Sequence, residues 1–164
     1  MTEARWKPSV TVAAVIERDG RYLLVEEQTS TGLRLNNPAG HLEPGESLAQ
    51  AVVREALEET ARHFAPSHLV GVYLARVISQ RSGEEVTYLR FAFDGAAGEA
   101  EPGRPLDAPV LRTLWMTLDE VRAESGRLRS PLVLRCLEDH QAGRRYPLEM
   151  LAADPSVWAS SAGA

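Results

Sequence analysis

The sequence predicts an α/β fold in which a mixed β-sheet is sandwiched between helices. Short apolar runs of strand length, such as residues 10–16, are interspersed with longer segments of helical period, such as residues 47–64. Hairpin signals at Asp19-Gly20 and Ser82-Gly83 occur beside longer connections. Both antiparallel and crossover connections are therefore expected within the sheet.

The first half of the chain predicts two strands, an irregular stretch and a long helix. Residues 10–16 are almost continuously apolar, which is typical of a buried strand, and Asp19-Gly20 turns the chain into a returning strand at 22–25. The polar stretch 26–37 contains Gly32 and predicts a loop, and a second irregular stretch covers 38–45. Residues 47–64 predict a helix whose apolar positions share one face.

The second half predicts three strands and two shorter helices. Residues 69–79 and 87–93 are strand-like, and a Gly- and Pro-rich loop at 95–109 leads to a short strand at 110–116. Thr117 and Glu120 form a capping-box pattern that predicts a helix at 117–124. Pro131 predicts the first turn of another helix, which extends to about residue 141.

Length and composition favour one soluble domain. The 164 residues fit a single unit, which we place at 1–159, with a disordered tail at 160–164. The net charge of −5 gives no indication of nucleic-acid or membrane binding, so a phosphate ligand must be neutralised locally. Cys136 is the only cysteine, which excludes an intrachain disulfide. No apolar segment is long enough to span a membrane, and we expect a cytoplasmic protein. The sequence does not predict an oligomeric state.

The helix at 47–64 carries a cluster of acids on its polar side. Glu55, Glu58 and Glu59 lie three and four residues apart and therefore share a face. Three carboxylates this close repel one another, and a hard divalent cation such as Mg²⁺ relieves the repulsion. Taken alone, the three glutamates would more simply predict a solvated acidic surface.

The residues before the acids favour the metal interpretation. Gly40 lets the backbone approach a cation, so that its carbonyl becomes a further oxygen ligand. Glu46 stands at the start of the helix, where a carboxylate caps free N–H groups, and we assign it a structural role. Arg54 can hold a carboxylate in place through a bidentate pair.

The stretch GHLEPGESLAQAVVREALEETAR resembles the Nudix box. The resemblance implies a Nudix fold and a hydrolase of phosphoanhydride bonds that depends on Mg²⁺, with Mn²⁺ as an alternative. Ala61 stands where the family has glycine, and Arg62 where it has an aliphatic residue. Because the glycine would end the helix in a left-handed conformation, we predict that the helix here continues through Arg62 or His63. Pro66 sets the outer limit.

A wider resemblance covers residues 6 to about 151. The stretches WKPSVTVAAVIERDGRYLLVEE, TYLRFAF, LRSPLV and RRYPLEM are similar to the NudJ-type Nudix phosphatases of bacteria. That similarity implies action on hydroxymethylpyrimidine diphosphate and on nucleoside tri- and diphosphates, with release of orthophosphate. Leu35 departs from the pattern, because it stands where tryptophan is expected.

These patterns assign roles to the acidic helix and its loop. Gly40, Glu55, Glu58 and Glu59 are the predicted metal ligands. Glu58, Glu55 and Arg54 are the predicted catalytic residues, with Glu58 either sharing the metal or acting as general base. The sequence does not separate these two roles for Glu58.

Residues outside the helix are predicted to contact a small phosphorylated substrate. Arg90 alternates with the core positions of its strand and projects towards the site, although a structural ion pair is an equal alternative. His41 lies beside the glycine loop, and Tyr88 shares a face with Arg90. Asp107, like Glu84 and Glu85, is a candidate for an additional acid.

Three other functions remain open at this stage. The first is hydrolysis of the inner phosphoanhydride bond of a nucleoside triphosphate or dinucleotide. The second is a Nudix-fold sensor that binds a nucleotide without cleaving it, which is disfavoured because all four glutamates of the box are present. The third is an isomerase of isoprenoid diphosphates, whose chemistry needs a reactive cysteine. Cys136 lies in an apolar helical stretch and is predicted to be buried.

Overall fold

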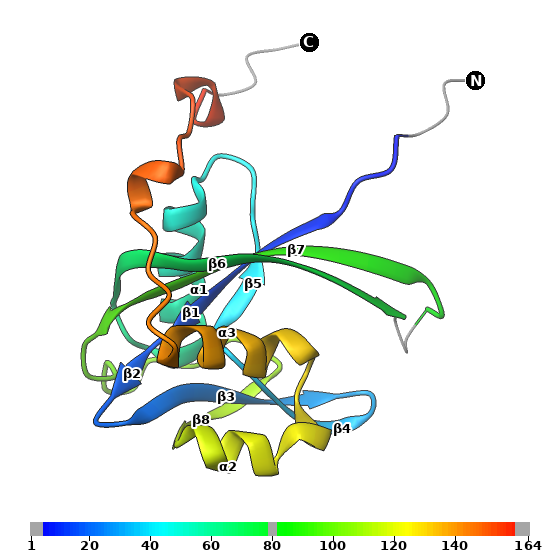
Figure 1. Ribbon diagram of the computed structural model, residues 1–164, viewed down its shortest axis with the longest axis vertical. Helices are drawn as coiled ribbons and strands as arrows, with labels where there is room; N and C mark the ends of the chain where they lie inside the picture. The colour runs from blue at the N-terminus through cyan, green and yellow to red at the C-terminus, as the bar shows by residue number, and fades with distance from the viewer. Residues whose placement is uncertain (1–4, 79–81, 160–164) are drawn as a thin grey trace.

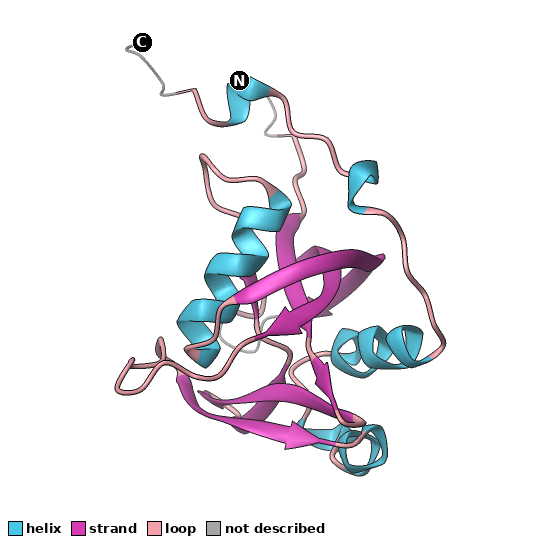
Figure 2. Cartoon of the chain, turned by 90° about the vertical axis from the view of Figure 1, so that its left-hand side faces the viewer, coloured by secondary structure: helices cyan, strands magenta, loops and turns pink. Residues whose placement is uncertain are grey.

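The computed structural model describes residues 5–78 and 82–159. Two four-stranded sheets form its centre, and helices cover them on both sides (Figures 1 and 2). The strands are β1 (Ser9–Val15), β2 (Glu17–Arg18), β3 (Arg21–Thr29), β4 (Gly32–Asn36), β5 (Ala39–His41), β6 (Phe64–Ile78), β7 (Glu85–Ala97) and β8 (Val110–Met116). The helices are α1 (Leu48–Thr60), α2 (Leu118–Ala123) and α3 (Pro131–Gln141), and short 3₁₀ turns lie at Ser125–Arg127, Leu148–Met150 and Pro155–Val157.

The first sheet is mixed and has the order β5-β1-β7-β6. Its central pair, β1 and β7, is parallel, whereas β5 and β6 join antiparallel at the two edges. The second sheet is antiparallel, with β3 pairing to β2, β4 and β8. The predicted α/β fold with a mixed sheet is thus confirmed, and the strands are divided between two sheets.

The apolar run of β1 is buried on both faces. Val12 and Ala14 pack with α1 in one core cluster, whereas Ala13 and Val15 pack with α3 and the second sheet in another. A continuous apolar sequence suits this position, because neither face of the strand meets water. The two cores fix α1 and its loop against the sheet that forms the floor of the candidate site.

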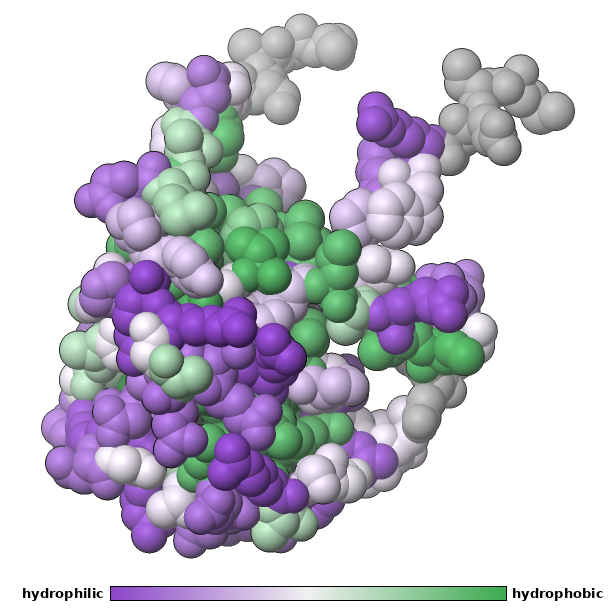
Figure 3. All heavy atoms as spheres, viewed as in Figure 1, coloured by the Kyte–Doolittle hydropathy of each residue, from purple (hydrophilic) through white to green (hydrophobic). Residues whose placement is uncertain are grey.

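The outer face of β6 is exposed. Val72 and Leu74 are 50% and 69% exposed, and they alternate with residues of the opposite face, such as Ala75, which line a cavity. Ile78, at the end of the strand, is 71% exposed and also borders the cavity. Figure 3 shows hydrophobic surface along the hairpin of β6 and β7, between more hydrophilic regions. No helix of the described residues is both long and apolar enough to cross a membrane.

The prediction of a loop at 26–37 was wrong. β3 continues to Thr29 and turns back through β4, which begins at Gly32. Polar residues fill these strands because one face of the hairpin lines a cavity: Glu27 opposes Arg34 across the pair. The polarity that indicated a loop therefore belongs to a strand whose side chains face the site.

The predicted extension of the box helix was also wrong. α1 ends at Thr60, and Ala61 caps it in the left-handed conformation with φ 55°. Its N–H donates to Leu57 O, and its carbonyl accepts from the N–H of Glu101. The chain must leave the helix here to begin β6 at Phe64, and these bonds hold alanine in a conformation that costs about 1–2 kcal/mol.

The last strand and the two later helices follow the prediction closely, whereas β6 begins at Phe64, five residues before the strand predicted at 69–79. Thr117 and Glu120 form the expected reciprocal capping box of α2, and Ser130 caps α3 with Pro131 in its first turn. β7 extends to Ala97, so the Gly- and Pro-rich loop begins later than residue 95. The last residue of the predicted strand at 69–79 and the predicted tail at 160–164 lie outside the described residues.

Candidate active site

Gly40 and Glu55 meet where β5 approaches α1. A Cβ atom built on Gly40 would lie 2.0 Å from Glu55 Oε1 and 2.1 Å from its carboxyl carbon. No side chain can occupy position 40 while the carboxylate stays in place. Glycine is therefore required so that the Glu55 carboxylate can rest directly against the backbone of the loop.

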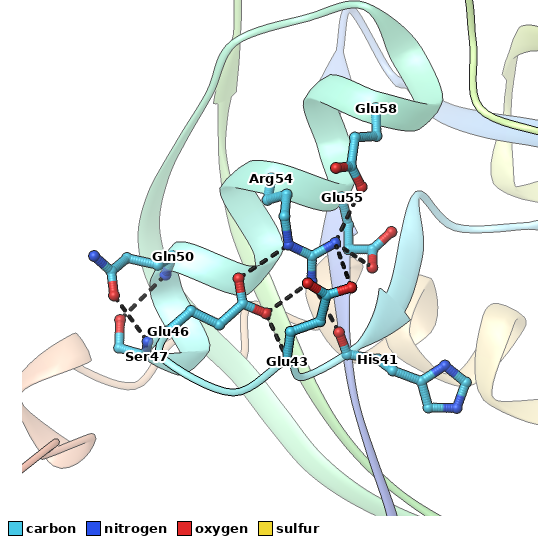
Figure 4. A network of polar contacts seen from close by, with 8 residues as sticks. All are labelled: His41, Glu43, Glu46, Ser47, Gln50, Arg54, Glu55 and Glu58. Atoms are coloured by element: carbon cyan, nitrogen blue, oxygen red, sulfur yellow. Dashed lines mark hydrogen bonds and ion pairs between the residues drawn. The ribbon is translucent and has the colours of Figure 1, made fainter. Parts of the chain in front are cut away.

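Arg54 connects this loop to the helix (Figure 4). Its Nε and Nη2 donate to the two carboxylate oxygens of Glu46 at 2.9 and 2.7 Å, and Nη2 also donates to His41 O at 2.9 Å. The bidentate pair with Arg54 lowers the pKa of Glu46. Glu46 does not cap the helix as predicted, because Ser47 is the N-cap of α1. Glu46 instead anchors Arg54, while accepting a further bond from the N–H of Glu43.

The remaining nitrogen of Arg54 binds two of the box acids. Nη1 donates to Glu55 Oε1 at 2.8 Å and to Glu58 Oε2 at 3.0 Å. Burial is the main reason why the pKa of Glu55 is raised, and the neighbouring charge of Glu58 adds to it. Arg54 thus supplies the positive charge that these carboxylates need. Within the described residues, no three acids, histidines or cysteines are grouped closely enough to hold a metal in this arrangement.

Glu59 is the most deeply buried acid of the box. It is 9% exposed, and its Oε2 accepts a single hydrogen bond, from the N–H of Ala39 at 2.8 Å. Burial, followed by the charges of Glu27, Glu55 and Asp107, raises the pKa of Glu59 to about 8. A desolvated carboxylate beside other acids is the kind of group that a divalent cation stabilises. The donor set of Glu55, Glu59 and the Gly40 backbone is all oxygen and fits Mg²⁺.

A cavity of about 1040 Å³ opens in front of these acids. Glu55, Glu59 and Gly40 line it, as do three of the predicted substrate contacts, which are His41, Tyr88 and Arg90. The rings of His41 and Tyr88 lie 6.3 Å apart. The structure therefore brings these sequence-predicted residues to one site.

Three other predicted acids lie elsewhere. Asp107 is exposed, and its N–H donates to Glu58 O, so it neighbours the box helix without lining the cavity. Glu85 pairs with Arg76 on the β6–β7 hairpin, and Glu84 is exposed beside it. Of these acids, Asp107 alone acts electrostatically on Glu59.

The cavity wall also carries an acid and two partners that the sequence pattern did not predict. Glu27 is 6% exposed, its Oε1 accepts from Asn36 Nδ2 at 3.2 Å, and its Oε2 lies 3.7 Å from Arg129 Nε. All three residues line the cavity. Alternation of polar and apolar residues along 33–36 was the available signal, since Leu33 and Leu35 alternate with Arg34 and Asn36.

Two further residues singled out from the sequence, Leu35 and Cys136, lie in the core. Leu35 is fully buried in the core of the described chain and does not line the cavity. Cys136 is also fully buried, and desolvation raises the pKa of its thiol to about 11. The predicted core position of Cys136 is confirmed, and this thiol is not available as a nucleophile or acid.

Comparisons with known proteins identify the family of this chain. The family model described as NUDIX domain matches residues 5–136. Phosphatase NudJ of Escherichia coli K12 is 36% identical over 146 residues, which cover 89% of this chain and 92% of that protein. The solved structure of a NUDIX hydrolase from Nitrosomonas europaea is 50% identical, with a TM-score of 0.82, and the match covers 90% of this chain and 98% of that one.

A solved structure with lower sequence identity has a similar fold. The crystal structure of UDP-X diphosphatase is 20% identical, with a TM-score of 0.67, and the match covers 89% of this chain and 68% of that one. At this identity the similarity shows the shared architecture alone. The family match, the relative and the two acids beside the Gly40 loop agree: the chain belongs to the Nudix hydrolases, enzymes that act on phosphoanhydride bonds.

Proposed function

We propose that this Nudix hydrolase is a Mg²⁺-dependent phosphatase of small organic diphosphates and of nucleoside tri- and diphosphates, releasing orthophosphate. The observation that carries the proposal is the Glu55 carboxylate seated against Gly40, beside buried Glu59, at the wall of a cavity of about 1040 Å³. The relative named Phosphatase NudJ supports the reaction class.

Four groups would hold the metal: Glu55, Glu58, Glu59 and the Gly40 carbonyl. When bound, Mg²⁺, or Mn²⁺ in its place, neutralises charge on the phosphate oxygens and lowers the pKa of water. Arg54 positions Glu55 and Glu58 by holding one oxygen of each. Its bond to the His41 carbonyl keeps the loop at a fixed distance from the helix.

Other steps of the reaction, proton transfer and substrate binding, are assigned to individual side chains. Glu58 is partly exposed and is our candidate for the general base, which takes a proton from the attacking water. His41, Tyr88 and Arg90 bind the substrate from the cavity wall. We give Asp107 an indirect role, since its charge acts on Glu59 from outside the cavity.

The attacked group follows from how a small diphosphate enters. The phosphoryl group that reaches the acids of α1 is the one attacked. A cavity that accepts a small diphosphate places the terminal phosphate there, because the organic part occupies the remaining volume. A nucleotide that enters in the same orientation would also lead with its terminal phosphate.

A substrate panel with a phosphate readout tests the proposal. Hydroxymethylpyrimidine diphosphate, GTP, GDP and a dinucleotide would be incubated with and without Mg²⁺, and orthophosphate and pyrophosphate measured separately. We expect orthophosphate from the diphosphates only when metal is present. Pyrophosphate or a cleaved dinucleotide as the main product would instead support inner-bond hydrolysis, and binding without any product would support a sensor.

A further inference from the structure

Arg90 presents a buried charge to the cavity without an acidic partner. The residue is 7% exposed and lines the cavity. Within the described part of the chain, no carboxylate lies within 4.0 Å of its guanidinium. Its Nη1 donates to the neutral Asn37 Oδ1 at 3.4 Å, and the guanidinium also interacts with the thiol of Cys136, so its partners there carry no negative charge. Its Nε has no hydrogen-bond partner. A buried charge is costly unless a counter-charge or hydrogen bonds compensate it.

Other unsatisfied polar atoms surround Arg90. Buried atoms without partners include Thr11 Oγ1, Asn36 Oδ1 and Asn37 Nδ2. Thr11 is the direct neighbour of Arg90 across the β1–β7 pair, and both Thr11 and Asn36 line the cavity. Such atoms are rare in folded proteins, and several together at a cavity floor indicate a polar ligand group.

Strand register places Arg90 near the loop of the acidic site. Thr11 pairs with Arg90 on one side and with His41 on the other, so Arg90 lies two strands from the residue after Gly40. Two strand spacings amount to about 10 Å between Cα atoms. An arginine side chain at that distance lies within reach of the substrate group next to the one held by the acids.

The other arginines of the cavity wall are more exposed to solvent. Arg129 is half-exposed, with its Nε 3.7 Å from Glu27 Oε2, and Arg34 is partly exposed. Arg90 is buried and has no carboxylate at such a distance. It is therefore the cavity cation that most needs an external anion, in a protein with a net charge of −5.

We propose that Arg90, with Thr11, forms an anion subsite that binds the phosphate adjacent to the one attacked. The inference rests on the proposed function and gives Arg90 a specific task within it. A guanidinium suits this task, since its planar fork matches two phosphate oxygens. The subsite would select diphosphates over monophosphates, because a substrate without the second phosphate would leave the buried charge uncompensated.

Methylenediphosphonate, a diphosphate mimic without an organic part, tests the subsite directly. Its affinity would be measured by calorimetry with Mg²⁺ for the wild type, Arg90→Gln and Arg127→Gln, along with the melting temperature of each ligand-free protein. Arg127 is the matched control, because it pairs with buried Glu26 and neither residue is among those that line the cavity. We expect Arg90→Gln to weaken binding at least ten-fold, with an unchanged or higher melting temperature. Arg127→Gln should lower the melting temperature and leave binding unchanged.

Each contrary result has a defined meaning. Unchanged affinity of Arg90→Gln for the mimic would overturn the subsite. If the same variant also had a raised KM for GDP, Arg90 would instead contact the nucleoside part of the substrate. A melting temperature lowered as much as in Arg127→Gln would make Arg90 structural and also overturn the proposal. Because the mimic is not hydrolysed, these results stand even if the enzyme releases no orthophosphate from any substrate, which would reject the proposed function alone.

Discussion

At the scale of single residues, the site depends on close contact between a backbone and a carboxylate. Gly40 leaves the space that Glu55 fills, and Arg54 holds Glu55 and the loop carbonyl of His41 together. Glu59 reaches the same loop through the N–H of Ala39. Small changes at these positions should therefore affect catalysis more than folding.

Gly40→Ala should separate activity from stability. The added methyl group would lie 2.0 Å from Glu55 Oε1, so the carboxylate must move, whereas the backbone can stay. We expect kcat to fall at least ten-fold, with a melting temperature within a few degrees of the wild type. Gly126→Ala is the control, because Gly126 also lines the cavity and its added methyl would meet nothing within 4 Å. Full activity in Gly40→Ala would remove the Glu55 contact from the mechanism.

Glu59→Gln tests the buried acid. Glutamine keeps an oxygen that can accept the Ala39 N–H but loses the charge that a metal needs. We expect roughly a 100-fold or greater loss of kcat. The metal-free melting temperature should not fall, because burial and the neighbouring acids already disfavour the ionised form of this carboxyl. Near-normal turnover would exclude Glu59 as a metal ligand.

At the scale of elements, the β3–β4 hairpin shows what the sequence pattern concealed. A polar strand that lines a cavity resembles a loop when only composition is considered, and the buried position of Glu27 could be known only from the pairing with β4. The end of α1 was predicted wrongly for a related reason. The intrinsic cost of a left-handed alanine was outweighed by the tertiary bonds that Ala61 makes.

Gly95→Ala tests the packing of β6 on β7. A Cβ at position 95 would lie 2.0 Å from Ala65 O and 2.8 Å from Pro66 Cα, and backbone atoms cannot easily move away. We expect a loss of about 1–3 kcal/mol in the free energy of unfolding, measured by urea denaturation. Gly98→Ala, whose methyl would meet nothing within 4 Å, should be nearly neutral. Equal stability of the two variants would contradict the register of this pair.

The ion pair between Arg127, in the turn Ser125–Arg127, and Glu26 should make the stability of the protein depend on pH. Hydrogen bonds from Arg112, and then from Arg127, lower the pKa of buried Glu26. Because the pKa of Glu26 is lower in the folded than in the unfolded protein, the ionised carboxylate stabilises the fold at any pH above the unfolded-state pKa. This stabilisation is lost as the pH falls through the folded-state pKa. Arg127→Gln should therefore lower the melting temperature by roughly 5 °C at neutral pH. The difference from the wild type should shrink below about pH 4. A constant difference across that range would contradict the assignment.

At the scale of the whole molecule, the sequence predicted the grouping of the box residues better than the wall of the cavity. The box spacing placed Gly40, Arg54 and Glu55 on one loop and one helix, and the structure brings them together. The cavity is assembled from α1 and from β1, β3, β4, β5, β6 and β7, together with residues between Gly126 and Leu132, so its wall depends on strand order. No local sequence pattern indicates the strand order, which explains why Glu27 and Asn36 were not predicted to line the cavity.

The central claim is that the terminal phosphate is attacked at the metal-binding acids of α1. Phosphorus NMR of the products of GDP hydrolysis in ¹⁸O-labelled water, with Mg²⁺, tests it most directly. Attack on the terminal phosphorus predicts that the label enters orthophosphate and that GMP remains unlabelled. Label found in GMP would mean attack on the inner phosphorus and would contradict the account.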